Sequence, residues 1–183
     1  KLQREQSVLE NRVDESNLHF NIIFDGYEHG SISYTILDIL DRAYREIGRE
    51  FDHFPDKPIT VVLYTEQDFF DVTRKPSWVA GLYDGKIRIP VRGVENVGRE
   101  TLRTVLYHEY VHAMIHDITP WAPNWLHEGL AEYLVPRGLQ RTGQDIPLRS
   151  LERSFPADDP RLVGTAYRVS YSVVAHLVER YSL

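Results

Sequence analysis

The sequence predicts an α+β fold, and two observations indicate it. Apolar runs typical of strands lie in the first half of the chain, at residues 18–24 and 59–64. From residue 98 onwards, apolar residues recur instead at the spacing of helices. Strands that come early and helices that come late favour α+β over an alternating α/β arrangement. We therefore expect a small mixed sheet with an edge strand over a helix that carries the functional residues, followed by a mainly helical C-terminal part.

The expected domain organisation follows from length and composition. The chain has 183 residues, of which 42% are hydrophobic and 26% charged, as in an ordinary globular domain. We expect residues 1–17 to form a charged helix or linker and residues 18–183 to form a single domain. Within that domain, residues 18–97 should contain the sheet and residues 98–183 the helices. Because the chain begins without Met and ends abruptly, we expect it to be part of a longer, multidomain protein.

Composition also argues against several classes of function. The net charge is −6 and no run of Lys or Arg occurs, which disfavours nucleic acid as a partner. No apolar stretch is long enough for a membrane span, and the charged first residues do not resemble a signal peptide. Cysteine is absent, so the chain has neither disulfides nor thiolate chemistry.

The elements of the first half can be predicted in order. After the strand at residues 18–24, Ser31 caps a long helix whose apolar residues repeat every three or four positions. Residues 59–64 form a nearly continuous apolar run, which is typical of a central strand buried on both faces. Thr65 then caps a short helix at residues 66–73. The apolar stripe of the long helix consists of Ile36, Leu40, Tyr44, Ile47 and Phe51.

A hairpin is expected at residues 78–91. Asp84 and Gly85 supply its turn, and polar and apolar residues alternate along its second strand, residues 86–91. Pro90 has no N–H to donate, so we expect this second strand at the edge of the sheet. An extended peptide could pair with such an edge by β-addition.

The second half is expected to be helical, at residues 98–117, 124–134, 148–153 and 165–181. The link at residues 118–123 is short and contains two prolines. The two helices that it joins should therefore pack as near-antiparallel neighbours.

The stretch HEYVH in the first of these helices predicts a metal site. His108 and His112 are four residues apart, so the helix places both on one face, one turn apart. Two imidazoles in this arrangement can share a zinc ion. Glu109 lies about 100° around the helix from His108, where it could take a proton from a water without binding the metal. The alternative is that the histidines only pack in the core. A third ligand elsewhere in the chain would favour the metal site over this alternative.

His116 is the nearest further histidine, but helix geometry excludes it as the third ligand. It lies eight residues from His108, which is about 12 Å along the helix axis, whereas nitrogens on one zinc lie roughly 3–4 Å apart. We expect His116 in the last turn, where a cation interacts favourably with the helix dipole. The sequence also lacks the longer HExxHxxGxxH motif, because Ile115 and Ile118 occupy the positions of its Gly and its third His.

The third ligand is predicted on the following helix, in the stretch NWLHEGLAEYL. Glu128 and Glu132 are four residues apart and share one face of this helix. Packing against the preceding helix can bring Glu128 to the metal, and Glu132 can then accept a hydrogen bond from a ligand imidazole. The alternative for both acids is a solvated helix face, which their apolar neighbours disfavour. His127 points about 100° away and is not expected to be a ligand.

Together these motifs resemble the gluzincin metallopeptidases, the peptidase MA clan that contains thermolysin and aminopeptidase N. The form P-x-W-L-x-E-G-L-A-E-Y is most similar to the compact bacterial domains called peptidase MA-like. The segments PITVVLYTEQDFF, GLYDGKIRIPV and AYRVSYSVVAHLVERY also resemble this domain, so the similarity extends over residues 18–183. The two metal motifs are specific for this family in combination, whereas the flanking segments match it less specifically.

The resemblance implies zinc-dependent hydrolysis of peptide bonds. It makes His108, His112 and Glu128 the zinc ligands. Glu109 would be the general base, and Glu132 the acid that supports a ligand imidazole. It also implies Zn²⁺ as the cofactor and a peptide or protein as the substrate. Since such domains are often attached to other segments in exported bacterial proteins, it further implies an exported or periplasmic location.

The family also places a tyrosine on a later helix, where it stabilises the oxyanion. The stretch AYRVSY falls at the matching place. Tyr167 is the better match because it precedes the body of the predicted helix. Tyr171, four residues on and on the same face, is the alternate. Either residue could instead be an ordinary tyrosine of the core.

The chain departs from the aminopeptidases in a way that concerns function. Their Gly-x-Met-Glu-Asn signature, which anchors a free amino terminus, is absent, and the only Met is Met114. We therefore expect an endopeptidase. The alternatives are a catalytically silent zinc-binding module that binds peptides within a larger protein, and hydrolysis of a non-peptide substrate at the same metal. A silent module has no need of Glu109, so it ranks second.

Overall fold

The computed structural model has the predicted α+β architecture, one mixed sheet with helices. It describes residues 12–25, 30–75, 79–90, 98–135, 146–153, 155–156, 159 and 161–181. The elements are β1 (Arg12–Ser16), β2 (Phe20–Asp25), α2 (Gly30–Phe51), β3 (Ile59–Tyr64), α3 (Glu66–Thr73), β4 (Leu82–Tyr83), β5 (Ile87–Pro90), α4 (Arg99–Ile118), α5 (Asn124–Leu134), α6 (Leu148–Arg153) and α7 (Val163–Tyr181).

The chain divides into two compact units, Lys1–Met114 and Ile115–Leu183, whose boundary lies within α4. The sequence placed the boundary between a sheet-containing and a helical part earlier, at residues 97 and 98. The single domain expected at residues 18–183 stays a prediction. Among the described residues, no helix combines the length and the apolar character needed to cross a membrane.

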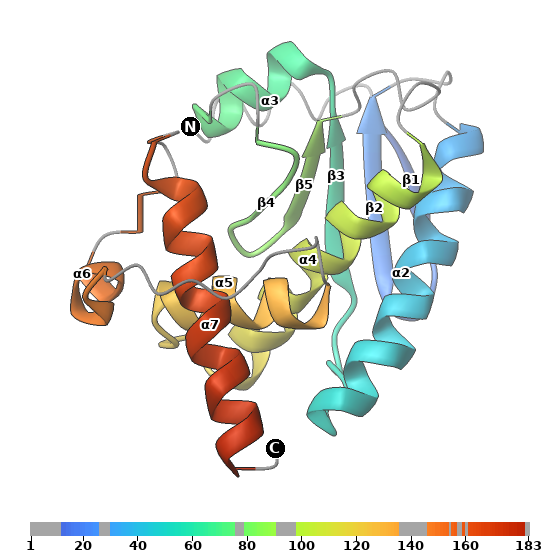
Figure 1. Cartoon of the computed structure of the whole chain (residues 1–183). Helices are drawn as coiled ribbons and strands as arrows, with labels where there is room; N and C mark the ends of the chain where they lie inside the picture. The colour runs from blue at the N-terminus through green and yellow to red at the C-terminus, as the bar shows by residue number, and fades with distance from the viewer. Residues whose placement is uncertain are drawn as a thin grey trace. The chain divides into compact units, whose positions relative to one another are not determined.

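The first unit is built on a sheet of five strands in the order β1-β2-β3-β5-β4 (Figure 1). β2, β3 and β5 run parallel to one another, with Ile22 opposite Val61 and Val61 opposite Ile87. β1 and β4 pair antiparallel with their neighbours at the two edges. The sheet is therefore mixed, and the hairpin of β4 and β5 forms one of its edges.

Each face of the sheet buries its own set of side chains. Residues that lie opposite one another share a face, so Val61 and Ile87 point to one side and Val62 points to the other. The first face packs against α4, where the rings of Phe20 and Tyr110 meet edge to face with their centroids 5.8 Å apart. β3 is buried on both faces, as its continuous apolar run predicted. The cluster on the opposite face contains Val62, Tyr64, Phe69 and Val72, with Val79 and Leu82 packed against it.

A hydrogen bond between side chains ties α4 to α2 within this unit. The Tyr107 hydroxyl donates to the Glu46 carboxylate over 2.8 Å. Burial of the phenol, reinforced by its acceptor Glu46, raises the pKa of Tyr107 to about 12. The hydroxyl therefore keeps its proton at neutral pH. Arg103, one turn earlier, lies over the Tyr107 ring with its Cζ 4.9 Å from the centroid.

The predicted hairpin is present, but the assignment of its second strand to the sheet edge was wrong. β5 lies between β3 and β4, and β4 is the edge strand. Pro90 gave the misleading signal. It lies opposite Tyr64 of β3, while the two-residue β4 pairs only with Ile87 and Arg88. The missing N–H of Pro90 therefore falls beyond the end of the edge strand and disrupts no pairing with it.

The structure also differs from the prediction at residues 12–16, which form β1 rather than a charged helix or linker. β1 pairs with β2 from Arg12 opposite Asp25 to Ser16 opposite Asn21. Its sequence, RVDES, contains one apolar residue and shows no alternation, so its strand conformation follows from the neighbouring β2 rather than from a local pattern. Residues 1–11, the rest of that predicted segment, lie outside the described residues.

The second unit is helical, and its helices α5 and α7 cross at a glycine. A Cβ on Gly129 would lie 2.5 Å from the Ser170 carbonyl oxygen and 2.6 Å from Val174 Cγ2. Glycine within a helix costs about 1 kcal/mol relative to alanine, and this close approach explains why α5 carries one. The cluster beside the crossing contains Leu151, Ala166 and Val169, with Trp125, Ile146, Leu148 and Phe155 packed against it.

Replacing Gly129 by Ala should lower the free energy of unfolding by about 1–3 kcal/mol, because the added methyl meets the backbone of α7. Gly164→Ala is the matched control, since Gly164 is exposed on α7 and its Cβ would meet only the Arg168 side chain at 3.8 Å. This control should stabilise the protein by up to about 1 kcal/mol. Urea unfolding of both variants tests the prediction, and equal effects would contradict it.

Candidate metal centre

α4 carries the HEYVH motif in its most buried part. Leu106, Tyr110 and Met114 follow one another at four-residue spacing and are completely buried, which anchors one face of the helix. Beside them His108 is 3% exposed and Glu109 is 6% exposed. Burial of such polar side chains costs free energy unless they interact with other groups. The burial of this pair therefore shows that this part of α4 is not a solvated surface.

His108 and His112 lie on one face of α4, as the four-residue spacing predicted. Their ring centroids are 4.8 Å apart, and the ring planes stand at 89° to one another. His108 is buried and His112 is half-buried. The two imidazoles are thus close neighbours, and one of them is partly accessible.

Glu109 packs against the residue that precedes the edge strand. A Cβ built on Gly81 would lie 2.7 Å from Glu109 Oε1 and 2.8 Å from Glu109 Cγ. The sequence analysis did not anticipate this contact of Gly81. Its only signal is a glycine ahead of a strand, which more often marks a bend or bulge than a neighbour of a buried carboxylate.

In the second unit, α5 carries both predicted acids. Glu128 is half-buried, and Glu132, one turn later, is 3% exposed. The alternative of a solvated helix face is therefore wrong for Glu132. Gly129 directly follows Glu128, so the tight crossing with α7 also fixes the rotation of α5 within this unit.

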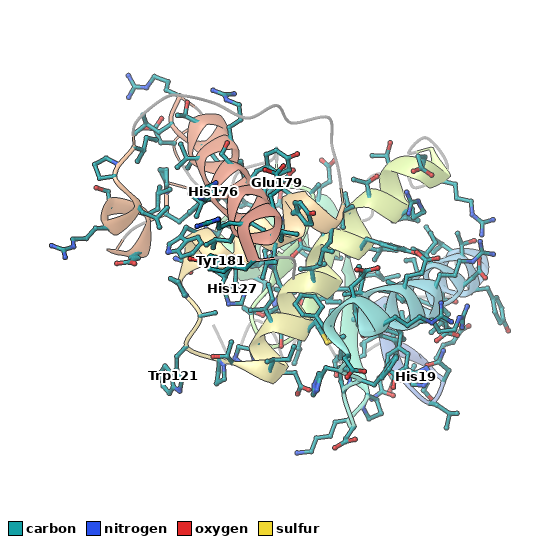
Figure 2. All side chains as sticks on the ribbon, turned by 60° about the horizontal axis from the view of Figure 1, so that its bottom comes forward. His19, Trp121, His127, His176, Glu179 and Tyr181 are labelled. Carbon is teal, nitrogen blue, oxygen red and sulfur yellow. The ribbon has the colours of Figure 1, made fainter. Side chains whose placement is uncertain are left out.

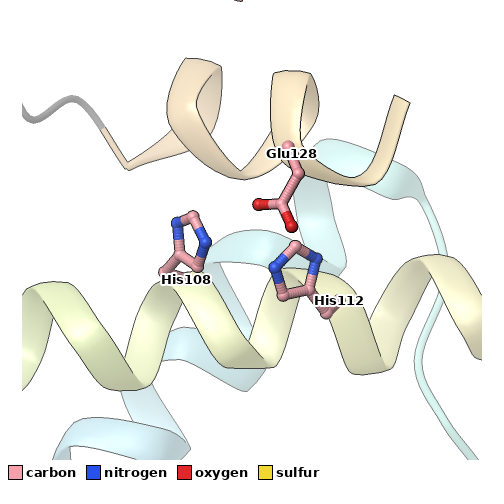
Figure 3. A group of neighbouring side chains, drawn as sticks. All are labelled: His108, His112 and Glu128. Atoms are coloured by element: carbon pink, nitrogen blue, oxygen red, sulfur yellow. The ribbon is translucent and has the colours of Figure 1, made fainter. Parts of the chain in front are cut away.

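Three of the predicted residues form a group that could hold a metal ion (Figure 3). His108, His112 and Glu128 each offer one ligand atom, and these atoms all lie within 4.8 Å of one another. Two imidazoles and one carboxylate suit zinc and related divalent transition metals. No other group of three or more His, Cys, Asp or Glu with this proximity occurs in the part of the chain that the structure describes.

The other histidines near the motifs lie outside this group. His116 is exposed in the last turn of α4, where the helix rise had placed it. His127 is half-buried on α5 and is not among the grouped residues. In the link between α4 and α5, Trp121 projects into solvent, with the residue 91% exposed (Figure 2).

Tyr167 and Tyr171 both lie within α7, which removes the reason for preferring Tyr167. α7 begins at Val163, so Tyr167 stands inside the helix instead of preceding it. Tyr167 meets Phe155 edge to face with centroids 5.4 Å apart. Tyr171 lies beside Tyr133, with centroids 6.4 Å apart. Both tyrosines are half-buried, so the choice between them stays open.

Comparison with known protein families decides the class of the chain. Residues 24–153 match the model of a family described as "Peptidase of plants and bacteria". The chain belongs to this family. The match spans His108, His112 and Glu128, and it confirms the relation to peptidases that the motifs predicted. The gluzincin clan is a finer assignment and stays a proposal. Searches of curated proteins and of solved structures found no match.

Removal of any one side chain of the group should weaken zinc binding by more than about 100-fold, since even residues that only support a ligand contribute about 10–100-fold. The variants are His108→Ala, His112→Ala and Glu128→Ala. His116→Ala on the same helix is the control and should bind zinc like the wild type. Metal content after zinc loading and dialysis measures the effect. Wild-type zinc content in the Glu128 variant would contradict the three-residue site.

Proposed function

We propose that this chain is a zinc-dependent metallopeptidase of the gluzincin type. The observation that carries the proposal is the group of His108, His112 and Glu128 in a chain that belongs to a peptidase family. In the proposal these three residues bind zinc, Glu109 is the general base, and Glu132 orients a ligand imidazole.

The donor set supports a zinc ion with a catalytic role. Catalytic zinc sites have three protein ligands and leave a position for water or substrate. Structural zinc sites normally have four protein ligands, often Cys, and this chain has no Cys. Calcium and magnesium prefer oxygen ligands, which two imidazoles do not offer.

When bound, zinc would polarise the scissile carbonyl and lower the pKa of an attacking water toward about 7. Glu109 would accept a proton from this water as the water oxygen adds to the carbonyl carbon. It would then deliver the proton to the amine as the C–N bond breaks, leaving a carboxylate and an amine as products. Glu132 would accept a hydrogen bond from a ligand imidazole and so fix the direction of its ring.

The substrate in this proposal is an extended peptide that pairs with β4. β4 is the edge strand at this end of the sheet, and Gly81 just before it lies against Glu109. Pairing by β-addition would place the peptide backbone next to that carboxylate. The absence of the Gly-x-Met-Glu-Asn signature supports cleavage within chains rather than at an amino terminus.

Replacing Glu109 by Gln should reduce kcat by about 10³-fold or more while zinc stays bound, because an amide has the shape of the carboxylate but accepts no proton. Glu100→Gln is the control, since Glu100 is exposed in the first turn of the same helix. Cleavage of a mixed peptide library and metal content are measured together. Normal cleavage by the Glu109 variant would contradict the proposal.

Either Tyr167 or Tyr171 of α7 should act as the donor to the oxyanion. Phe at that position should lower kcat by about 10²–10³-fold, whereas Phe at the other should change it only a few-fold. Tyr167→Phe and Tyr171→Phe are therefore controls for one another, and both keep the ring and its packing. If neither variant loses activity, the tyrosine role is wrong.

A zinc-binding module without catalysis, which binds peptides within a larger protein, is the second candidate. Stable zinc binding without turnover of any peptide would favour it over the peptidase. For either candidate we propose a peptide or protein partner and no nucleic acid. We also propose an exported or periplasmic location in a bacterium, which the resemblance to peptidase MA-like domains supports.

A further inference from the structure

The space next to the Glu109 carboxylate is set by the absence of a side chain on Gly81. A Cβ at this position would lie 2.7 Å from Oε1, 2.8 Å from Cγ and 3.0 Å from Cδ of Glu109. All three distances are at or below the shortest approach that real Cβ atoms make. Because the three nearest atoms all belong to one side chain, a methyl group here would act on Glu109 before anything else.

We infer that Gly81 is a positioning residue for Glu109, and this inference rests on the proposed function of Glu109 as the base. The backbone at Gly81 packs against the Glu109 side chain and so limits where the carboxylate can lie. Any larger residue would push the carboxylate away from its place. Gly81 also directly precedes β4, so the residue that limits the carboxylate adjoins the edge strand that would hold the peptide.

The reason for glycine at this position is space and not backbone conformation. Gly85 is the described glycine with φ in the left-handed region, at +93°, whereas Gly81 has no such φ. Alanine can therefore adopt the backbone of Gly81 without strain. Only the contact with the carboxylate opposes it.

Gly81 and Gly129 are both closely packed, but they should respond differently to alanine. At Gly129 the added methyl meets the backbone of α7, which cannot move without disturbing the helix crossing. At Gly81 it meets only side-chain atoms of Glu109, from Cγ to Oε1, and this side chain can change its rotamer. Gly81→Ala should therefore leave stability nearly unchanged and displace the carboxylate.

The first test measures the carboxylate itself and needs no activity. In protein labelled with ¹³C in the side-chain carboxyl of glutamate, the resonance that disappears in Glu109→Gln belongs to Glu109. Gly81→Ala should shift this resonance, while Gly164→Ala should leave it in place. An unshifted Glu109 resonance in Gly81→Ala would overturn the inference.

The second test is kinetic and uses the zinc-loaded protein. Gly81→Ala should lower kcat by about 10- to 100-fold, the effect of moving a reacting group by about 1 Å. KM should stay within about 2-fold of the wild-type value, and the zinc content within about 10%. The melting temperature should stay within about 2 °C of the wild type. Unchanged kcat would overturn the inference. A loss of zinc, or a fall in melting temperature like that of Gly129→Ala, would assign Gly81 a structural role and overturn it equally.

Removal of the acid separates action through Glu109 from other effects. In a Glu109→Ala background the added methyl finds neither Cγ nor a carboxylate in its way, so Gly81→Ala should lower the residual kcat by at most about 2-fold more. If Gly81→Ala lowered kcat by about 10- to 100-fold in this background as well, the inference would be contradicted. If the wild-type protein hydrolyses no peptide with zinc bound, the proposed function fails, while the ¹³C resonance still decides whether Gly81 positions the carboxylate.

Discussion

The separation of His108 and His112 by one helical turn is the constraint on which the rest of the structure depends. It holds only if α4 stays helical through the motif and keeps a fixed rotation about its axis. Completely buried residues four apart, from Leu106 to Met114, anchor the helix, and Tyr107 ties it to α2 through Glu46. The sheet thus serves mainly as a support that holds the two imidazoles of α4 in place.

Elements with strong local signals could be predicted from the sequence almost to the residue. The apolar run at Ile59–Tyr64 is the central strand, and Thr65 caps α3 by accepting a hydrogen bond from the Asp68 N–H over 3.1 Å. The spacing of the two histidines was equally local, since it needs only the helix period. Excluding His116 required the helix rise alone, so this result too needed no tertiary structure.

Features that depend on distant parts of the chain could not be predicted. β1 exists because β2 offers it a free edge, and the position of β5 inside the sheet depends on where the short β4 ends. The role of Gly81 depends on a contact with Glu109, which lies on a different element far along the chain. A glycine carries no side-chain pattern, so only the structure distinguishes a turn residue from one that makes room for a carboxylate.

The coordination of zinc in the wild-type protein tests the central claim most directly. X-ray absorption at the zinc K edge of the zinc-loaded protein reports the number of imidazole ligands and the metal–ligand distances. The account predicts one zinc per chain with two imidazoles and light oxygen ligands, all at about 2.0–2.2 Å. A zinc with one or three imidazoles, or a protein that retains no zinc, would contradict it.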